Sequence, residues 1–341
     1  MMRATLASWL ACAALAAQAP ATLAPQAHRG VCWVGGASER GLTELKEMGV
    51  EWISVTPFAY GQRQKDQLPP GGRFQAAEGR GESLADARRV TQLAHQLGLK
   101  VMIKPHVWFQ GRNGLWHGDI AMTNPDDWLD WFRAYGTFLK PFVELAEAEK
   151  VDALCIGTEL KGTTTGSPEH WRGMIQRIRA IYHGPLTYAA HWDREFETIP
   201  FWQDLDWIGV QSYFPLTDKG QPTVDELCQG WAQWVERIEA VARRTRRPIV
   251  FTEMGYRPSL GTAIKPWEWR NQAEFSEDAQ ADAYEAFFRV FAQREWFLGC
   301  YVWKWFSSPP RRQDFSPQGL KGVEVLRRWF AAPAATSRPA R

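Results

Sequence analysis

The stretch VDALCIGTEL, residues 151–160, puts an ionisable glutamate, Glu159, at the end of an apolar run. A continuous apolar run of this length is typical of a strand that is buried on both faces. A second stretch, PIVFTEMGY at residues 248–256, repeats the arrangement and ends in Glu253. The two glutamates are therefore candidates for a functional pair carried by two buried strands.

Short apolar segments of this kind alternate with longer amphipathic ones along the whole chain. Eight have the pattern of strands, at residues 30–35, 51–58, 99–107, 151–159, 185–192, 206–214, 248–255 and 299–306. Helical patterns lie between and after them, at residues 39–49, 83–96, 125–148, 168–182, 224–243, 277–294 and 319–330. Continuously apolar strands that alternate with helices predict a parallel sheet covered on its faces. The fold class is therefore α/β, and eight repeats favour a (β/α)8 TIM barrel over an open doubly wound sheet.

The composition is that of a globular protein with a large core. Of 341 residues, 45% are hydrophobic and 23% are charged, and the formal net charge is +2. Such a balance gives no electrostatic basis for binding nucleic acid or an anionic membrane. The 19 Trp residues are a clear excess, and Trp is suited to stacking on flat, weakly polar surfaces such as sugar rings.

The barrel is expected to form a single domain over residues 28–331, and we expect a monomer. Residues 1–24 carry one early positive charge followed by an apolar run, which predicts a signal peptide and a secreted or periplasmic protein. A lipid anchor at Cys12 is the alternative, but the residues before it, Trp9-Leu10-Ala11, fit that signal poorly. The Pro/Ala/Arg-rich tail, 332–341, is expected to be disordered.

The cysteines after the leader show no paired or metal-binding spacing. They are Cys32, Cys155, Cys228 and Cys300, which lie far apart in the sequence. Three lie in apolar strand-like runs, which favours small buried hydrophobic side chains. Export permits a disulfide without requiring one.

The ends of the predicted strands carry a concentration of polar and aromatic residues. In a barrel of this kind, the side chains that act on a ligand come from the carboxyl ends of the strands. Besides the two glutamates, these ends supply Lys104, His106, Trp108, Thr158, His191, Trp192, Tyr213, Trp303 and Trp305. Any one of them alone would also fit a solvated loop residue or a satisfied core group. Two glutamates at matching strand ends, surrounded by His, Tyr and Trp, favour a catalytic site.

Paired carboxylates across a barrel mouth suit glycoside hydrolysis. One carboxyl group protonates the leaving oxygen, and the other attacks or assists at the anomeric carbon. The acid needs surroundings that raise its pKa, whereas the nucleophile needs hydrogen bonds that keep it ionised. Tyr213, on the strand beside the one that carries Glu253, is well placed to donate such a bond.

At these residues the sequence resembles the clan A glycoside hydrolases. Within that clan, CIGTELKGTT and VFTEMGYRP are similar to two regions of glycoside hydrolase family 113, whose characterised members are β-mannanases. The resemblance extends from about Gly30 to Phe330. It implies a retaining double-displacement mechanism in which Glu159 is the acid/base and Glu253 the nucleophile. Most of the clan has Asn before the acid/base, where this chain has Thr158, so the usual contact to the sugar 2-hydroxyl must come from elsewhere or be weaker.

The resemblance further implies a β-1,4-mannan or manno-oligosaccharide substrate, cleaved internally. An exo-acting enzyme or another β-glycosidase of the clan is the alternative. The segments Gly61–Gly81 and Pro258–Ser276, the second with Trp267 and Trp269, either shape sugar subsites or are solvated loops.

Two other classes of function fit the sequence less well. A metal-dependent barrel hydrolase would need a His-x-His on its first strand, where this chain has Cys32-Trp33-Val34. No nucleotide-binding GxGxxG or GxxxxGK follows that strand, so we expect neither metal nor cofactor. A catalytically inactive barrel that only binds glycans would not need both Glu159 and Glu253.

Overall fold

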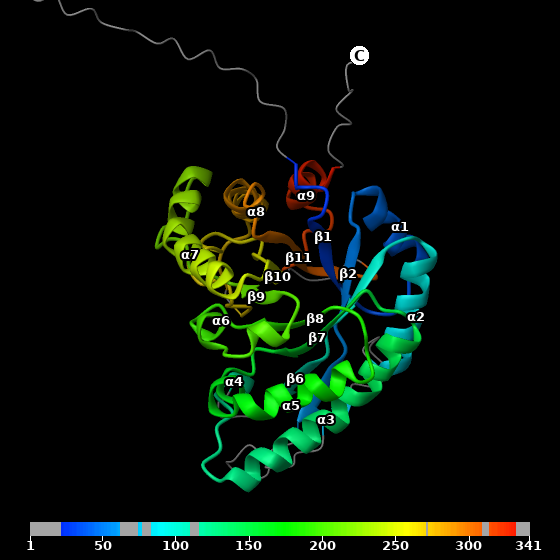
Figure 1. Cartoon of the computed structure of the whole chain (residues 1–341). Helices are drawn as coiled ribbons and strands as arrows, with labels where there is room; N and C mark the ends of the chain where they lie inside the picture. The colour runs from blue at the N-terminus through cyan, green and yellow to red at the C-terminus, as the bar shows by residue number, and fades with distance from the viewer. Residues whose placement is uncertain are drawn as a thin grey trace, which may run out of the picture.

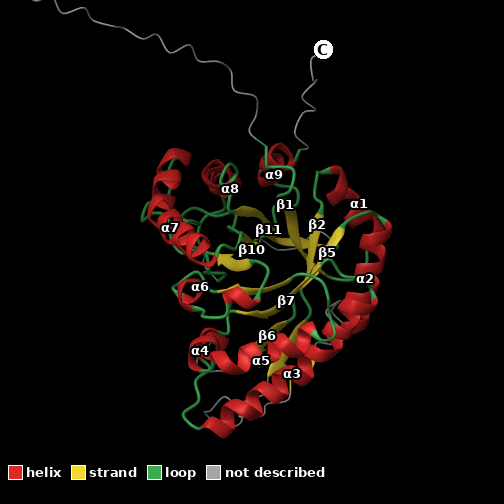
Figure 2. Cartoon of the chain, in the orientation of Figure 1, coloured by secondary structure: helices red, strands yellow, loops and turns green. Residues whose placement is uncertain are grey.

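The computed structural model describes residues 22–61, 74–76, 83–109, 116–270, 272–308 and 314–331. In it eight parallel strands close into a barrel in the order β1-β11-β10-β9-β8-β7-β5-β2, and helices surround it (Figures 1 and 2). The barrel strands are β1 His28–Val34, β2 Trp52–Val55, β5 Lys100–Ile103, β7 Ala153–Thr158, β8 Leu186–Ala190, β9 Ile208–Ser212, β10 Ile249–Met254 and β11 Phe297–Phe306. Each overlaps one predicted segment, so the predicted (β/α)8 barrel is confirmed. Residues 1–21 of the predicted signal peptide and the tail, 332–341, lie outside the described residues.

Each barrel strand serves two cores with alternate side chains. On β7, Ala153 and Cys155 point into the small cluster inside the barrel. Leu154 and Ile156 point outward into the large cluster between strands and helices. Because both faces of the strand are buried, the sequence must be apolar at every position rather than at every second one. This is why the strands appear as continuous apolar runs.

The helices follow the strands and cover the outside of the barrel. They are α1 Glu39–Glu47, α2 Leu84–Gln96, α3 Pro125–Ala148, α4 Lys161–Gly166, α5 Pro168–Arg179, α6 Glu195–Thr198, α7 Val224–Thr245, α8 Glu277–Phe291 and α9 Gly322–Phe330, with short 3-10 turns η1 His117–Asp119 and η2 Trp202–Asp204. Ser83 and Asp86 make a capping box on α2, and the Asn124 side chain caps α3. Only α4 and α6 were not predicted, because a helix of one or two turns leaves no periodic pattern.

Two predicted strands were too long, and prolines explain the difference. The segment 51–58 breaks at Pro57 into β2 and a second strand, β3 Phe58–Gly61; the segment 99–107 breaks at Pro105 into β5 and β6 His106–Phe109. Proline has no N–H to donate to a ladder. With β4 Phe74–Ala76, β3 and β6 form a separate three-stranded sheet. The break carries His106 onto this small sheet.

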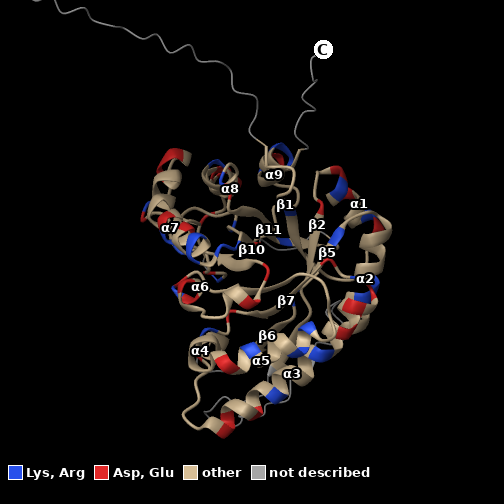
Figure 3. Ribbon diagram, viewed as in Figure 1, with Lys and Arg blue, Asp and Glu red and all other residues tan. Residues whose placement is uncertain are grey.

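Charges of both signs are interspersed over the outer helices (Figure 3). Several form pairs along one helix, such as Arg40 with Glu44 at 2.8 Å on α1. This distribution agrees with the small formal net charge of +2. In the described part of the chain, no helix has both the length and the hydrophobicity to cross a membrane.

Candidate active site

A β-bulge turns Glu253 toward its partners. The pairing of β10 with both β9 and β11 shifts register after Phe251, immediately before the glutamate. Bulges next to active sites commonly re-aim a side chain. Beyond the bulge, Met254 packs into the outer cluster, whereas the carboxylate of Glu253 meets Lys104 and Tyr213.

Each oxygen of the Glu253 carboxylate accepts one strong hydrogen bond. Lys104 Nζ donates to Oε1 at 2.5 Å, and the Tyr213 hydroxyl donates to Oε2 at 2.7 Å. Burial is the largest single effect on the pKa of Lys104 and acts to lower it, but the charge of Glu253, the hydrogen bond to it and the nearby Cys32 and Cys155 together raise that pKa. Burial and the same carboxylate raise the pKa of Tyr213 well above its usual range. Lys104 is therefore a cation and Tyr213 a neutral donor, and both stabilise an ionised Glu253.

Lys104 bonds the carboxylate rather than facing open solvent. Its side chain is 0% exposed, and its ammonium also donates to the Thr252 carbonyl at 3.3 Å. The sequence left open whether this lysine binds a sugar hydroxyl or neutralises a carboxylate. The contacts in the structure fit neutralisation.

Glu159 has very different surroundings. It directly follows β7, after a register shift between Cys155 and Thr158. Its backbone is left-handed, with φ of 51°, and its N–H donates to the Ala189 carbonyl at 2.8 Å. Its side chain is 16% exposed. Among the described residues, no hydrogen bond reaches its carboxylate; the Nε2 atoms of His117 and His191 lie 3.8 and 3.9 Å from its oxygens.

These surroundings favour the protonated form of Glu159. Burial is the largest cause, and the negative charges of Glu253 and Glu195 add to it, so the pKa of Glu159 is raised well above its usual range. The charge of Glu253 is one of the causes of this shift, so the two carboxyl groups are close enough to interact electrostatically. A carboxyl group whose surroundings favour its protonated form thus stands near a carboxylate that two donors bind.

The histidines around the two glutamates are neutral. Burial, and then the charge of Lys104, holds the pKa of His106 well below its usual range. Burial lowers the pKa of His117 to about 3 and that of His191 to about 4. They therefore offer neutral donors or acceptors at neutral pH rather than counter-charges. His106 Nε2 is 3.7 Å from Glu253 and has no hydrogen-bond partner in the described part of the protein.

Several of the predicted substrate-binding residues gather around these groups. The ring of Trp303 lies parallel to that of His106, with centroids 6.1 Å apart. Trp108 is 39% exposed and its ring is 5.3 Å from that of His117. Thr158 is buried, and its hydroxyl has no partner among the described residues.

Trp305 is placed elsewhere. The sequence offers both Trp303 and Trp305 as candidates for the floor of the site, and the structure separates them. Trp303 packs with the small cluster inside the barrel, whereas Trp305 belongs to the outer cluster and is 6% exposed. The structure therefore favours Trp303 as the floor residue.

Trp192 connects the acid side of the site to the segment Pro258–Ser276. It follows His191, and its ring stacks on that of Trp267 with centroids 4.9 Å apart. Backbone hydrogen bonds from Leu260 to Glu274 and from Ser276 to Pro258 close the base of the segment. Trp267 itself is 40% exposed. Of the two interpretations of this segment, the structure favours one that shapes the site.

Sequence reasoning missed Trp116, His117 and Glu195. Trp116 and His117 lie in the loop between β6 and α3, and the Trp116 ring is 4.6 Å from that of His191. The only available signal was a histidine in a loop that follows a barrel strand. Glu195 resembled a surface residue of an irregular stretch, yet it is 0% exposed.

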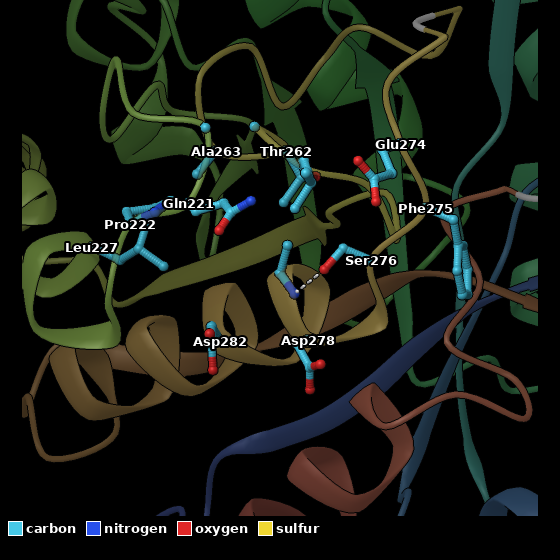
Figure 4. Close-up of a pocket in the computed structure, with 14 residues that line it drawn as sticks. Gln221, Pro222, Leu227, Thr262, Ala263, Glu274, Phe275, Ser276, Asp278 and Asp282 are labelled. Carbon is cyan, nitrogen blue, oxygen red and sulfur yellow. Dashed lines mark hydrogen bonds between the residues drawn. The ribbon is translucent and has the colours of Figure 1, made fainter.

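A separate polar cavity of about 340 Å³ lies between the loops that follow β9 and β10. Gln221 and Thr262 line it together with the acidic residues Glu274, Asp278 and Asp282 (Figure 4). Neither Glu159 nor Glu253, nor any of the described hydrogen-bond partners of their carboxylates, lines it. A larger groove, of about 650 Å³, lies between α3 and α5 on the outside of the barrel. Neither hollow contains the paired carboxylates, so the site is defined by side-chain chemistry.

The described residues contain no group of three or more His, Cys, Asp or Glu arranged to hold a metal ion. The four described cysteines are free thiols. Burial raises the pKa of Cys32 to about 12 and that of Cys155 to about 11, so neither is a reactive thiolate at neutral pH.

Comparison with known proteins shows the family and the fold of the chain. Residues 21–317 match Glycoside Hydrolase Family 113. A β-mannanase of that family from Alicyclobacillus acidocaldarius, AaManA, solved in complex with ManMIm, is 26% identical, with 89% of this chain and 96% of that chain covered and a TM-score of 0.75. A complex of a family 113 β-1,4-mannanase is 22% identical, with 89% and 98% covered and a TM-score of 0.75.

More distant structures share the fold. A β-glucuronidase from Ruminococcus gnavus is 14% identical, with 89% of this chain and 49% of that chain covered and a TM-score of 0.59. No curated protein matches the sequence.

Proposed function

The chain belongs to glycoside hydrolase family 113 and is a glycoside hydrolase, and on that premise we propose that it cleaves β-1,4-mannosidic bonds within a chain, with retention of configuration. Glu253 is the nucleophile and Glu159 the acid/base. The observation that carries this proposal is the contrast between the two carboxylates. Glu253 accepts hydrogen bonds from Lys104 and Tyr213. The Glu159 carboxyl group accepts none from the described residues, and burial is the largest cause of its raised pKa.

In the first step, the Glu253 carboxylate attacks the anomeric carbon while Glu159 gives its proton to the glycosidic oxygen. The leaving sugar departs, and a covalent glycosyl-enzyme remains. In the second step, Glu159, now a carboxylate, takes a proton from a water molecule that attacks the same carbon. The bond to Glu253 breaks, and both glutamates return to their starting protonation states. The two inversions together retain configuration.

The substrate assignment rests on the family, on the small net charge and on the aromatic residues beside the site. The solved family 113 structures that align with most of this chain are β-mannanases. The small formal net charge suits a neutral sugar better than an anionic polymer. The stacked pair Trp192 and Trp267 extends an aromatic surface away from the acid, which suits a ligand longer than one sugar.

The test is to incubate the pure protein with manno-, cello-, xylo- and β-1,3-gluco-oligosaccharides. We expect cleavage of the manno-series at internal bonds, with β-configured products in proton NMR spectra taken early in the reaction. Release of one sugar at a time from chain ends would show an exo-acting enzyme. Cleavage of another series with the manno-series untouched would overturn the substrate, and α-configured first products would overturn the two-step mechanism.

We also propose that the protein is exported, on the basis of its leader-like first residues, and that it acts as a monomer. Mass spectrometry of protein recovered from its native cell should find a mature N-terminus near residues 17–25. An intact Met1 would contradict export. Sedimentation should give the mass of one chain.

A further inference from the structure

We propose that Glu195, a buried carboxylate outside the catalytic pair, is a positioning residue that holds the acid/base Glu159 through Tyr188 and His191. The inference rests on the proposed role of Glu159. Glu195 belongs to the short helix α6, after β8, and its side chain is fully buried. An ionised carboxylate loses its hydration when it is buried, which is unfavourable unless protein groups replace the water. Glu195 is therefore expected to have hydrogen-bond donors around it.

Three donors converge on Glu195. The Tyr188 hydroxyl donates to Oε1 at 2.7 Å, and the Thr164 hydroxyl donates to the same oxygen at 2.9 Å. The His191 backbone N–H donates to Oε2 at 2.6 Å. A carboxylate that meets only donors is satisfied in its ionised form. Glu195 therefore joins β8, the residue after β8 and α4 at a single point.

The connection to Glu159 runs through Tyr188. The hydroxyl that donates to Glu195 also accepts a hydrogen bond from the backbone N–H of Leu160 at 2.7 Å, and Leu160 is the residue after the acid/base. Glu159 itself is bound to β8 by its own N–H. The chain on both sides of the acid side chain is thus fixed, on one side by a strand and on the other by Tyr188 and Glu195.

This support coincides with unusual backbone geometry. Glu159 has φ of 51°, and Arg194, next to Glu195, has φ of 63°. Left-handed backbone is unfavourable for a non-glycine residue, so it persists only where the surroundings impose it. The hydrogen bonds from Leu160 to Tyr188 and from Tyr188 to Glu195 provide that constraint beside Glu159.

Glu195 acts on Glu159 in two ways. Through the backbone of His191 it fixes the imidazole whose Nε2 lies 3.9 Å from Glu159. Through its charge it adds to the causes that raise the pKa of Glu159. Burial raises the pKa of Glu195 itself to about 7, against the effect of its three donors. The other ionisable groups that face this cluster are Tyr188 on β8, His191 and Asp193 after β8, and Lys161 on α4, which pairs with Asp193 at 3.4 Å.

The test compares Glu195→Gln with a matched control, Glu197→Gln. Glu197 is two residues along the same helix, partly exposed, and pairs with Arg237 at 2.5 Å. The first readout needs no substrate: carbon-13 NMR titration of the glutamate carboxyl groups, with the Glu159 signal assigned by its loss in Glu159→Gln. We expect the Glu159 titration to move to lower pH in Glu195→Gln, because a negative charge that raises its pKa is removed. In the control it should stay in place.

The second readout is kinetic. In Glu195→Gln, kcat/KM should fall roughly 10- to 100-fold on a manno-oligosaccharide, whose leaving group needs protonation. On 2,4-dinitrophenyl β-mannoside, which needs none, it should change little.

An unmoved titration together with equal losses on both substrates would show that Glu195 only supports the fold. If Glu195→Gln does not fold, Tyr188→Phe takes its place and should show the same dependence on the leaving group; equal losses there would overturn the proposal. A wild-type protein that cleaves no mannoside would overturn the proposed substrate, and the titration would still decide the role of Glu195.

Discussion

The two halves of the cleft treat the same functional group in opposite ways. Around Glu253 the chain supplies a buried cation and a phenol, one to each carboxylate oxygen. Around Glu159 it supplies neutral histidines just beyond hydrogen-bond distance, with further negative charge behind. The first half stabilises a carboxylate and the second a carboxylic acid. Chemical identity is therefore a poor guide to the role of a buried glutamate, and the donors within 3 Å of it are a better one.

The contrast between the two glutamates predicts the largest loss of activity when the Glu253 carboxylate is removed. Glu253→Ala should fold normally and lose activity by at least about 10⁴-fold, because no other group can form the covalent intermediate. Azide should restore turnover on an activated β-mannoside and give a glycosyl azide of α configuration, which NMR identifies. Circular dichroism is the control for folding. Substantial activity in this variant without azide would move the nucleophile to another residue.

Removing the other carboxyl group should produce a selective loss. In Glu159→Ala, kcat/KM on manno-oligosaccharides should fall about 10²- to 10⁴-fold, since general acid catalysis contributes on that scale. On 2,4-dinitrophenyl β-mannoside it should be nearly unchanged, and azide should give the β-configured adduct. Comparing the two substrates with one enzyme preparation makes the measurement independent of protein concentration. Equal losses on both substrates would mean that Glu159 is not the general acid.

A smaller change should weaken the donor half without abolishing it. Tyr213→Phe removes one of the two donors to Glu253 and should lower kcat/KM about tenfold. Its profile of kcat/KM over activated aryl mannosides and manno-oligosaccharides should fall evenly, because the lost bond is to the nucleophile, which acts on both kinds of substrate. Tyr256→Phe is the matched control: Tyr256 is three residues from Glu253 and fully buried, and its hydroxyl has no partner among the described residues. Identical profiles for both variants would remove Tyr213 from the account.

The smallest effect is expected at the edge of the acid half. Trp267→Ala removes the ring stacked on Trp192 and should raise KM for long manno-oligosaccharides about two- to tenfold, the equivalent of one aromatic contact. Its kcat, and its kcat/KM on a short aryl mannoside, should not change. A loss on the aryl mannoside as large as that on a hexasaccharide would show that this segment supports the catalytic centre rather than a distant sugar.

The barrel and its two glutamates were accessible from the sequence because their signals are local. An apolar run followed by a glutamate needs only neighbouring residues to be recognised, and eight such runs predict the closed sheet. The breaks at Pro57 and Pro105 were also visible locally, but the apolar pattern continues across them and hid the small sheet. At these positions the missing N–H of proline ends the strand even though the sequence stays apolar.

The remaining features depend on contacts between distant segments. Which of Trp303 and Trp305 faces the cleft depends on strand geometry near the end of β11, and no alternation rule holds there. Glu195 follows no apolar strand pattern of its own, and its burial results from the approach of Tyr188 and α4. The bulges that aim Glu159 and Glu253 arise from register with neighbouring strands, which a single chain read in order does not reveal.

The left-handed backbone at Glu159 has a consequence for how this protein can evolve. Glycine or asparagine adopts that conformation more readily than glutamate, so the residue best suited to the backbone is not the one that the proposed mechanism requires. A lineage released from selection for activity would gain stability by exchanging Glu159 for one of them. Descendants that have lost the enzymatic role should therefore have glycine or asparagine at position 159. Substitution without a backbone preference would instead give many different residue types there. That position records whether selection on turnover is still acting.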